Sequence, residues 1–207
     1  MKEIEISVKL GKELTADEIR QLTAQMCSAE DWNNVEVAEG FMPEKVHHTR
    51  FSGLIRLGVF TKEFHLPGGM RKHSGIGFAT LHNVTVGDDC CIENVKNYIA
   101  NYEIGHDTFI ENVDIILTDC VSSFGNGVEV SVLSETGGRE VMIFDNLTAQ
   151  TAYVMALYRH RPEMVSRLRG MIEAYVEGVS SSIGTIGSNS VIVDSGYIKN
   201  VKVGDFC

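Results

Sequence analysis

The sequence predicts a mainly β protein, a solenoid of short stacked strands that has an N-terminal helix and is interrupted by a helical hairpin. Three observations lead to this fold. Apolar residues recur at every sixth position after Val86, the phrase at residues 83–90 returns almost unchanged at 200–207, and the intervening residues have helical spacing. A fixed short period is typical of solenoids, in which each turn buries its apolar row only by stacking on the next.

The six-residue period is clearest in the middle of the chain. Six consecutive blocks open with an aliphatic or aromatic residue: VGDDCC, IENVKN, YIANYE, IGHDTF, IENVDI and ILTDCV. At a spacing of 18 residues the agreement is closer, because Val86-Gly87-Asp88 corresponds to Ile104-Gly105-His106. Three blocks therefore make one turn, and we expect Val86, Ile92, Ile104 and Ile110 to point into the core of a three-sided coil.

The same pattern resumes at Ile186-Gly187 and ends in NVKVGDFC, a near copy of NVTVGDDC at residues 83–90. Asparagine precedes valine in one slot of the repeat four times, at Asn83, Asn94, Asn112 and Asn200. Stacked amides can hydrogen-bond from turn to turn, so this slot predicts an amide ladder. The chain has 20 glycines against three prolines, and we expect the glycines at the corners of the coil.

A helix is expected near the N-terminus. The segment TADEIRQLTAQM offers Thr15 as N-cap, acidic residues in the first turn, and an apolar stripe of Ile19, Leu22 and Met26. Such a helix can cover the open end of a solenoid, whose exposed strand would otherwise recruit other chains. Residues 1–50 are therefore interpreted as a helix-containing cap.

A second helical region interrupts the repeat. Apolar residues fall at helical spacing from Tyr153 to Val176, and Pro162 suits the first turn of a second helix. These features predict a helical hairpin at 146–180, inserted between a first β part with a glycine-rich loop at 51–145 and a continuation at 181–207. Because the chain stops before the next repeat opening, we expect it to be a fragment of a longer protein.

Composition excludes several classes of function. The net charge of −10 disfavours nucleic acid and anionic membranes, and no apolar stretch is long enough to span a bilayer. Five cysteines, two of them adjacent, indicate a reducing compartment, and no metal-ligand spacing is present. The sequence therefore predicts a cytoplasmic protein without a metal site or a nucleic-acid partner.

Aliphatic-glycine openings on this period resemble the hexapeptide repeats of left-handed parallel β-helix proteins. The resemblance covers residues 76–133 and 183–207. Longer phrases, KNYIANYEIG, SSFGNGVEV, ETGGREV and ALYRHRP, look like a bacterial family with such a helix near its N-terminus. Left-handed β-helix proteins are typically trimeric acyltransferases or tail domains of sugar nucleotidyltransferases. The resemblance therefore implies a homotrimer, a sugar or nucleotide-sugar substrate, and an acyl-CoA as co-substrate with no tightly bound cofactor.

Acyltransferases of this type generally use a histidine as base, and an imidazole titrates in the right range for that task. His82 is the first choice as catalytic residue, because the later copy has Lys199 in the same slot and the fold itself does not require imidazole there. His106 follows a repeat glycine and is expected at a solvated corner. A zinc hydratase of this fold would need a third histidine in phase with these two, and the sequence has none.

The residues expected to bind substrate lie in two places. The stretch 122–141 breaks the repeat and gathers glycines around Asn126, Glu129, Glu135 and Arg139, which suits an anion site or, alternatively, a tight hairpin closed by a Glu–Arg pair. Asn101, with Asn97, Tyr98 and Tyr102 nearby, would suit a sugar, although Tyr98 occupies a slot expected in the core.

Two classes of function remain open. The first is a transferase acting on a sugar or nucleotide-sugar; the second is a non-catalytic β-helical scaffold or oligomerisation module of a longer protein. The glycine-rich signature of nucleotidyltransferases is missing, and no residue trio in the sequence joins a base to an orienting carboxylate. The transferase is preferred by analogy with the fold.

Overall fold

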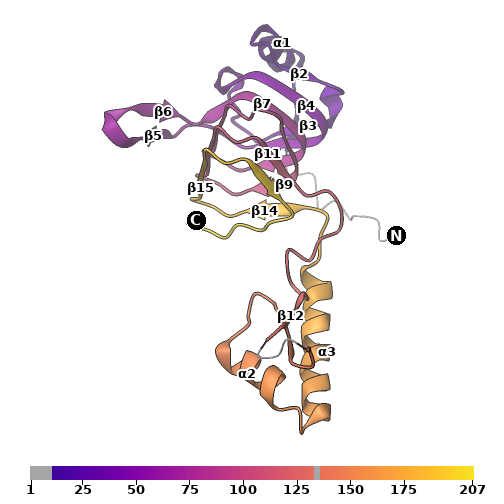
Figure 1. The fold of residues 1–207 in the computed structure, drawn as a ribbon. Helices are drawn as coiled ribbons and strands as arrows, with labels where there is room; N and C mark the ends of the chain where they lie inside the picture. Colours follow the sequence, from indigo (N-terminus) through magenta and orange to yellow (C-terminus); the bar gives the residue numbers. More distant parts are fainter. Residues whose placement is uncertain (1–10, 133–135) are drawn as a thin grey trace. The chain divides into compact units, whose positions relative to one another are not determined.

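A computed structural model of the chain describes residues 11–132 and 136–207. The prediction of a mainly β protein with helices is confirmed: the described residues form parallel and antiparallel strands and three α-helices (Figure 1). The chain divides into two compact units. We call Met1–Asp119 with Ile183–Cys207 the stacked unit, and Cys120–Ser182 the helical unit.

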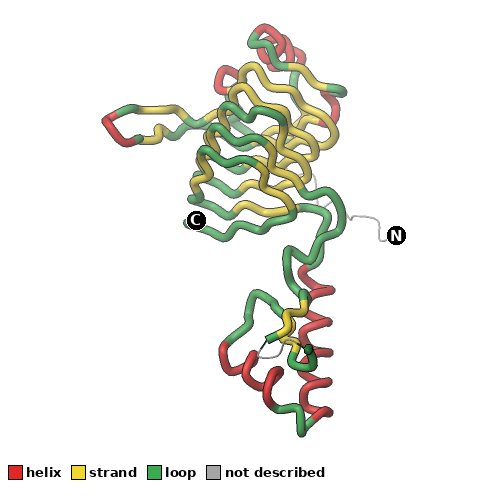
Figure 2. Tube along the Cα trace, in the orientation of Figure 1, coloured by secondary structure: helices red, strands yellow, loops and turns green. Residues whose placement is uncertain are grey.

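Parallel strands dominate the stacked unit, and Figure 2 shows its chain winding through successive turns that lie on one another. One set of neighbours is β3 (Val35–Val37), β4 (Val46–Leu57), β7 (Gly75–Val86), β8 (Cys91–Glu93), β10 (Phe109–Glu111) and β15 (Val191–Val193). Four further strands pair alongside: β9 (Tyr98–Ile104), β11 (Ile115–Leu117), β14 (Gly184–Ile186) and β16 (Tyr197–Lys199).

The register matches the sequence repeat. Ile110 lies opposite Ile92 on one side and Ile192 on the other, and Val86 lies opposite Ile104. Residues 18 positions apart thus become neighbours, as the spacing predicts. The expected inward residues, Val86, Ile92, Ile104 and Ile110, are all buried in one continuous core.

Three columns of left-handed backbone separate the strands. The Phe78 corner contains His48, Phe78, Asn94, Asn112 and Asp194; the Asn101 corner contains Gly53, Asn83, Asn101 and Asn200; the Asp107 corner contains Asp89, Asp107, Asn189 and Phe206. Asparagine and aspartate enter this conformation more readily than other side chains, because their short polar groups bond locally. Residues 78–89, 94–107 and 194–206 each pass once through all three columns.

Glycine has a different role from the one expected. The repeat glycines Gly87 and Gly105 do not have positive φ; a Cβ on Gly87 would lie 2.8 Å from the nitrogen of His106, and one on Gly105 would lie 2.6 Å from that of Ser188. They permit the close approach of successive turns beside the Asp107 corner. The prediction that glycines supply the bends is thus wrong for these positions.

Helix α1 (Ala16–Ala24) begins as predicted, with Thr15 as N-cap and Glu18 completing a capping box. Leu22 enters the core, but the helix ends before Met26, which is 70% exposed with a φ of 62°. Met26 is therefore not part of the apolar stripe. The remaining N-terminal elements are β1 (Lys12–Glu13), β2 (Ser28–Ala29), and the short 3-10 helices η1 (Trp32–Asn34) and η2 (Pro43–Lys45).

Tyr98 also differs from its expected position. It is 37% exposed, whereas Ile99 and Tyr102 are fully buried. The step from Ile92 to Ile99 is seven residues instead of six, so Ile99 takes the inward slot and Tyr98 turns outward.

A hairpin that the repeat does not predict projects from the stacked turns (Figure 1). It consists of β5 (Glu63–His65), the 3-10 turn η3 (Pro67–Gly69) and β6 (Arg71–His73). This excursion separates β4 from β7 in the sequence.

The helical unit has its own small core. The strands β12 (Glu129–Ser131) and β13 (Glu140–Met142) form an antiparallel pair, followed by α2 (Ala149–Leu157) and α3 (Pro162–Val179). Pro162 occupies the first helical position, as predicted. Val141, Met142, Met155, Ala156 and Ile172 are buried together. In the described residues, no helix has the length and apolar character that a membrane crossing requires.

Candidate functional site

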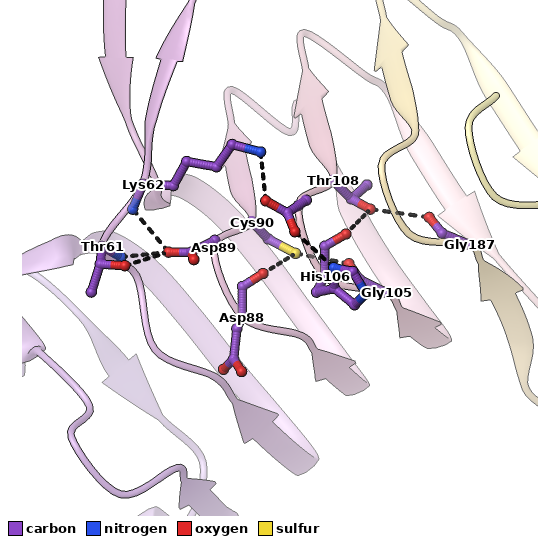
Figure 3. A network of polar contacts seen from close by, with 10 residues as sticks. Thr61, Lys62, Asp88, Asp89, Cys90, Gly105, His106, Thr108 and Gly187 are labelled. Atoms are coloured by element: carbon purple, nitrogen blue, oxygen red, sulfur yellow. Dashed lines mark hydrogen bonds and ion pairs between the residues drawn. The ribbon is translucent and has the colours of Figure 1, made fainter.

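The hairpin is attached at its base to the Asp107 corner. Where the chain leaves the stacked strands, one carboxylate oxygen of Asp89 accepts hydrogen bonds from the amides of Thr61 (2.6 Å) and Lys62 (2.8 Å) and from the Thr61 hydroxyl (2.9 Å). Burial alone would raise the pKa of Asp89. The hydrogen bonds from Thr61 and Lys62 outweigh this effect, so the net pKa is lower than usual. Figure 3 shows Asp89, Lys62 and His106 within this one network.

The opposite arm of the hairpin is held by charge. The Lys72 ammonium bridges Glu93 and Glu111, at 2.5 Å from each carboxylate. Burial lowers the pKa of Lys72, but the two carboxylates more than reverse this, so the pKa is raised and Lys72 stays charged. Phe64 adds an edge-on contact with Phe109, with ring centroids 5.3 Å apart.

A histidine and a carboxylate meet at the Asp107 corner. His106 Nδ1 lies 2.7 Å from Asp107 Oδ2, and Lys62 Nζ lies 2.5 Å from the other carboxylate oxygen. The hydrogen bonds from Lys62 and then from His106 lower the pKa of Asp107, so it is a carboxylate at neutral pH.

This geometry fixes the tautomer of His106. A carboxylate can only accept, so Nδ1 carries the proton and Nε2 of the neutral ring keeps its lone pair. The His106 side chain is 59% exposed, and no described residue hydrogen-bonds to Nε2. An imidazole whose Nδ1 is held by a carboxylate and whose Nε2 faces solvent can accept a proton at Nε2.

The thiols beside this corner cannot act as nucleophiles at neutral pH. Cys90 donates to the carbonyl of Gly105 at 3.0 Å, and burial raises its pKa to about 12. Burial also raises the pKa of Cys91 to about 12. Both remain thiols, and the thiolate is the reactive form of cysteine.

On its other side the hairpin base borders a pocket of about 330 Å³, lined among others by His47, Lys72, Ser74 and Glu93. The Ser74 amide donates to the Lys62 carbonyl at 2.7 Å, so the pocket and the His106 corner share this base. Ser74 is 2% exposed, and neither its hydroxyl nor Nδ1 of His47 has a hydrogen-bond partner in the described chain. Buried polar groups are normally paired.

His82, the catalytic residue chosen from the sequence, lies on the surface at the Asn101 corner. Its Nδ1 is 2.8 Å from the Ser52 hydroxyl, and its Nε2 is 3.1 Å from the amide nitrogen of Asn83. The same amide nitrogen donates to Asn101 Oδ1 at 3.1 Å, and Asn101 donates to the Thr118 carbonyl at 2.7 Å. The predicted ladder of Asn83, Asn94, Asn112 and Asn200 in one slot is wrong, because Asn94 and Asn112 lie at the Phe78 corner and Asn83 and Asn200 at the Asn101 corner. The amide contact at this corner joins Asn83 to Asn101 instead, and both nitrogens of His82 have partners.

Three of the predicted substrate-binding residues belong to the helical unit. Asn126 is buried and bonds to Ser123 and to Asp145, so its amide stabilises the loop. Glu129 forms an ion pair with Arg169, and Arg139 is exposed beside the β12–β13 turn. Glu135 lies outside the described residues. The strands β12 and β13 form the hairpin that was the alternative interpretation, although Glu129 pairs with Arg169 of α3 and Glu140 with Arg159 in the turn between α2 and α3.

The partner of His106 was not predicted from the sequence. The adjacent Asp107 is visible in IGHDTF, but side chains of successive residues normally point apart. The described residues contain no group of three or more histidines, cysteines, aspartates or glutamates that could hold a metal ion.

Comparison with known proteins gives one family and one curated relative. The chain is 27% identical over 202 residues to an "Uncharacterized protein" of Treponema pallidum (strain Nichols), covering 92% of this chain and 28% of that protein. The chain thus spans less than a third of that relative. No solved structure matches this chain. Residues 11–207 match the family model described as Domain of unknown function (DUF4954), so the chain belongs to that family.

Proposed function

We propose that the stacked unit is a left-handed parallel β-helix of hexapeptide repeats. Two features support this: parallel pairing of residues 18 positions apart, and three left-handed residues in each of the stretches 78–89, 94–107 and 194–206. A coil with three flat faces satisfies its backbone groups along the stack and leaves side chains at the bends free for chemistry.

We further propose that the protein is a transferase that moves an acyl group from an acyl-CoA to a sugar hydroxyl, with His106 as general base. The observation that carries this proposal is the carboxylate-oriented imidazole with an open Nε2. His106 takes the place that the sequence analysis gave to His82, whose nitrogens are both engaged.

In this reaction Nε2 of His106 accepts the proton of the attacking sugar hydroxyl. The oxygen forms a bond to the thioester carbonyl carbon, and collapse of the tetrahedral intermediate breaks the carbon–sulfur bond. The imidazolium then returns its proton to the departing CoA thiolate, so protons and charge balance. The Asp107 carboxylate stabilises the imidazolium, as a buried aspartate does for other catalytic histidines.

The pocket beside Ser74 supports a sugar as the acceptor. Lys45 and Lys72 line it together with Glu44 and Glu93, so its formal charges balance, and its lining offers both donors and acceptors. A polyhydroxylated ring needs this mixture. We propose a homotrimer in which a neighbouring subunit shields the exposed His106.

The test measures thiol release from acetyl-CoA and succinyl-CoA with a panel of sugars and nucleotide-sugars. His106→Gln is expected to lower kcat by about a hundredfold or more, because a general base contributes about 10²–10⁴. His82→Gln is the matched control and should retain most activity. A wild-type protein that releases no thiol with any pair, or an active His106→Gln variant, would refute the mechanism.

A non-catalytic scaffold is the second candidate. It is favoured by an almost wholly apolar groove in the helical unit, where Val130, Ile143, Tyr153 and Leu157 are each more than a third exposed. A trimer that forms normally but never turns over an acyl-CoA would favour this candidate over the transferase.

A further inference from the structure

A second pocket lies at a different corner of the stacked unit from His106. Its volume is about 410 Å³. Met26 after α1, His48 and Arg50 of β4, Phe78 of β7, and Lys96 after β8 line it. All of these residues belong to the stacked unit, and none of them is used by the proposed acyl transfer.

One wall of this pocket is an exposed aromatic stack. The rings of His48 and Phe78 are nearly parallel, with centroids 4.5 Å apart and an interplanar angle of 17°, and His47 contacts Phe78 edge-on at 5.5 Å. Phe78 is 50% exposed. An aromatic surface open to water is the usual platform for a planar ring.

The fold itself does not require a phenylalanine at this position. Phe78 has a φ of 52°, in a column where later turns have Asn94, Asn112 and Asp194. A bulky side chain in left-handed backbone is strained, whereas asparagine and aspartate accept it readily. Strained residues of this kind concentrate at functional sites, which points to a use for the ring.

The charges of the lining are all positive. Arg50 and Lys96 are exposed, and no acidic residue lines the pocket. Among the residues described, neither Arg50 nor Lys96 has an ion-pair partner, and the lining residue Asn97 donates a hydrogen bond to the carboxylate of Asp114. In a chain with a net charge of −10, a pocket with only cations selects a small anion.

We propose that this pocket binds a nucleotide, with the base against Phe78 and His48 and the phosphates against Arg50 and Lys96. Aromatic stacking and two unpaired cations match a planar ring that carries phosphate. Two cations in an acidic protein are too few to hold a long nucleic acid. The nucleotide can be free or can be the adenosine phosphate part of CoA; both present the same chemistry, and the experiment separates them.

The experiment is calorimetric titration of the whole chain with ADP, UDP, CoA, adenosine and pyrophosphate. We expect ADP or UDP to bind more tightly than adenosine or pyrophosphate alone, because each half supplies part of the affinity. Binding of CoA with no binding of ADP or UDP would assign the site to the co-substrate, whereas pyrophosphate binding as tightly as ADP would overturn the role of the rings.

Phe78→Asn provides the sharpest variant, because asparagine fits the left-handed backbone and should leave the melting temperature unchanged or higher. We expect the Kd for ADP or UDP to rise at least about tenfold, from the loss of one stacking partner. Phe206→Asn is the matched control: Phe206 is also exposed with a φ of 57°, but it lies at the Asp107 corner, and its loss should not change the Kd.

The cations are tested by Arg50→Gln with Lys96→Gln, which should weaken nucleotide binding and flatten its dependence on salt. An unchanged Kd in Phe78→Asn, or no nucleotide binding to the wild type at millimolar concentration, would refute the site. Neither outcome depends on acyl transfer, so this proposal and the transferase can fail separately.

Discussion

Two exposed histidines stand at different corners of the same stacked turns, and they differ in their partners. His82 meets a hydroxyl and an amide, while His106 meets a carboxylate. Asn83 follows His82 with a φ of 53°, and Asp107 follows His106 with a φ of 58°, so both are in the left-handed region. Each histidine is therefore followed by a left-handed residue, and the two differ in the side chain that this residue presents to the imidazole.

The consequence is a difference in where a proton can go. The amide of Asn83 donates to Nε2 of His82 and occupies the lone pair that a base would use. The carboxylate of Asp107 accepts from Nδ1 of His106 and leaves Nε2 open. Two imidazoles that precede left-handed residues in the same stacked unit thus differ in whether Nε2 is free to accept a proton.

The largest expected effect comes from removing the charge at the Asp107 corner. Asp107→Asn keeps the shape and the left-handed backbone, but a neutral amide does not stabilise imidazolium. We expect kcat for acyl transfer to fall by about a hundredfold or more, with little change in the melting temperature. Stopped assays of CoA release at saturating donor measure kcat. Retention of the wild-type kcat would show that Asp107 does not assist His106.

The next largest effect is on stability, at the Asn101 corner. Asn101→Ala removes two hydrogen bonds. It also places alanine, which has no polar side chain to bond locally, in left-handed backbone. We therefore expect the free energy of unfolding to fall by about 2 kcal/mol. That corresponds to roughly 4–8 °C in melting temperature. Asn101→Gly removes the same hydrogen bonds without the backbone strain and is the control.

Calorimetry of the two variants separates strain from hydrogen bonding. Asn101→Gly should lie between the wild type and Asn101→Ala. If Asn101→Gly melts with the wild type while Asn101→Ala melts lower, the amide hydrogen bonds contribute nothing and Asn101 serves the backbone alone. If both variants melt with the wild type, neither role is supported.

The repeat made much of the stacked unit predictable. Ile92 and Ile110 are 18 residues apart, so their pairing and burial follow directly from the period. The start of α1 was visible from the capping side chain of Thr15. The start of α3 was visible from Pro162, whose fixed φ and missing N–H suit a first helical turn.

What the period could not predict are the departures from it. The hairpin at β5 and β6 has no counterpart in other turns. Nothing in the repeat therefore indicated that Lys62 and Lys72 would form ion pairs with carboxylates on later turns. The seven-residue step that turns Tyr98 outward is a register effect of the same kind.

The candidate site was harder to predict for a related reason. His106 was correctly expected at an exposed corner, but its partner depends on the left-handed turn at Asp107 and on Lys62 from the hairpin. Both are three-dimensional conditions, and only the glycine before His106 was a signal in the sequence.

The smallest expected effect is a dependence of stability on pH at the Asp107 corner. The pKa of Asp107 is lowered by Lys62 and then by His106, so this contact stabilises the fold above the unfolded pKa of about 3.9. The stabilisation is lost as pH falls through the lower folded pKa. Lys62→Met should therefore melt below the wild type at pH 7, by about 1 kcal/mol or less for a partly exposed pair, and this gap should shrink below about pH 4.

Lys62 also lies over the Phe64 ring, at 4.9 Å from its centroid, and that contact does not depend on the charge of Asp107. Lys62→Met in an Asp107→Asn background isolates it, because any gap that remains there should be constant with pH. If the gap between wild type and Lys62→Met stays constant from pH 7 to pH 3, the lysine does not act through the carboxylate, and His106 is oriented by Asp107 without help from the hairpin.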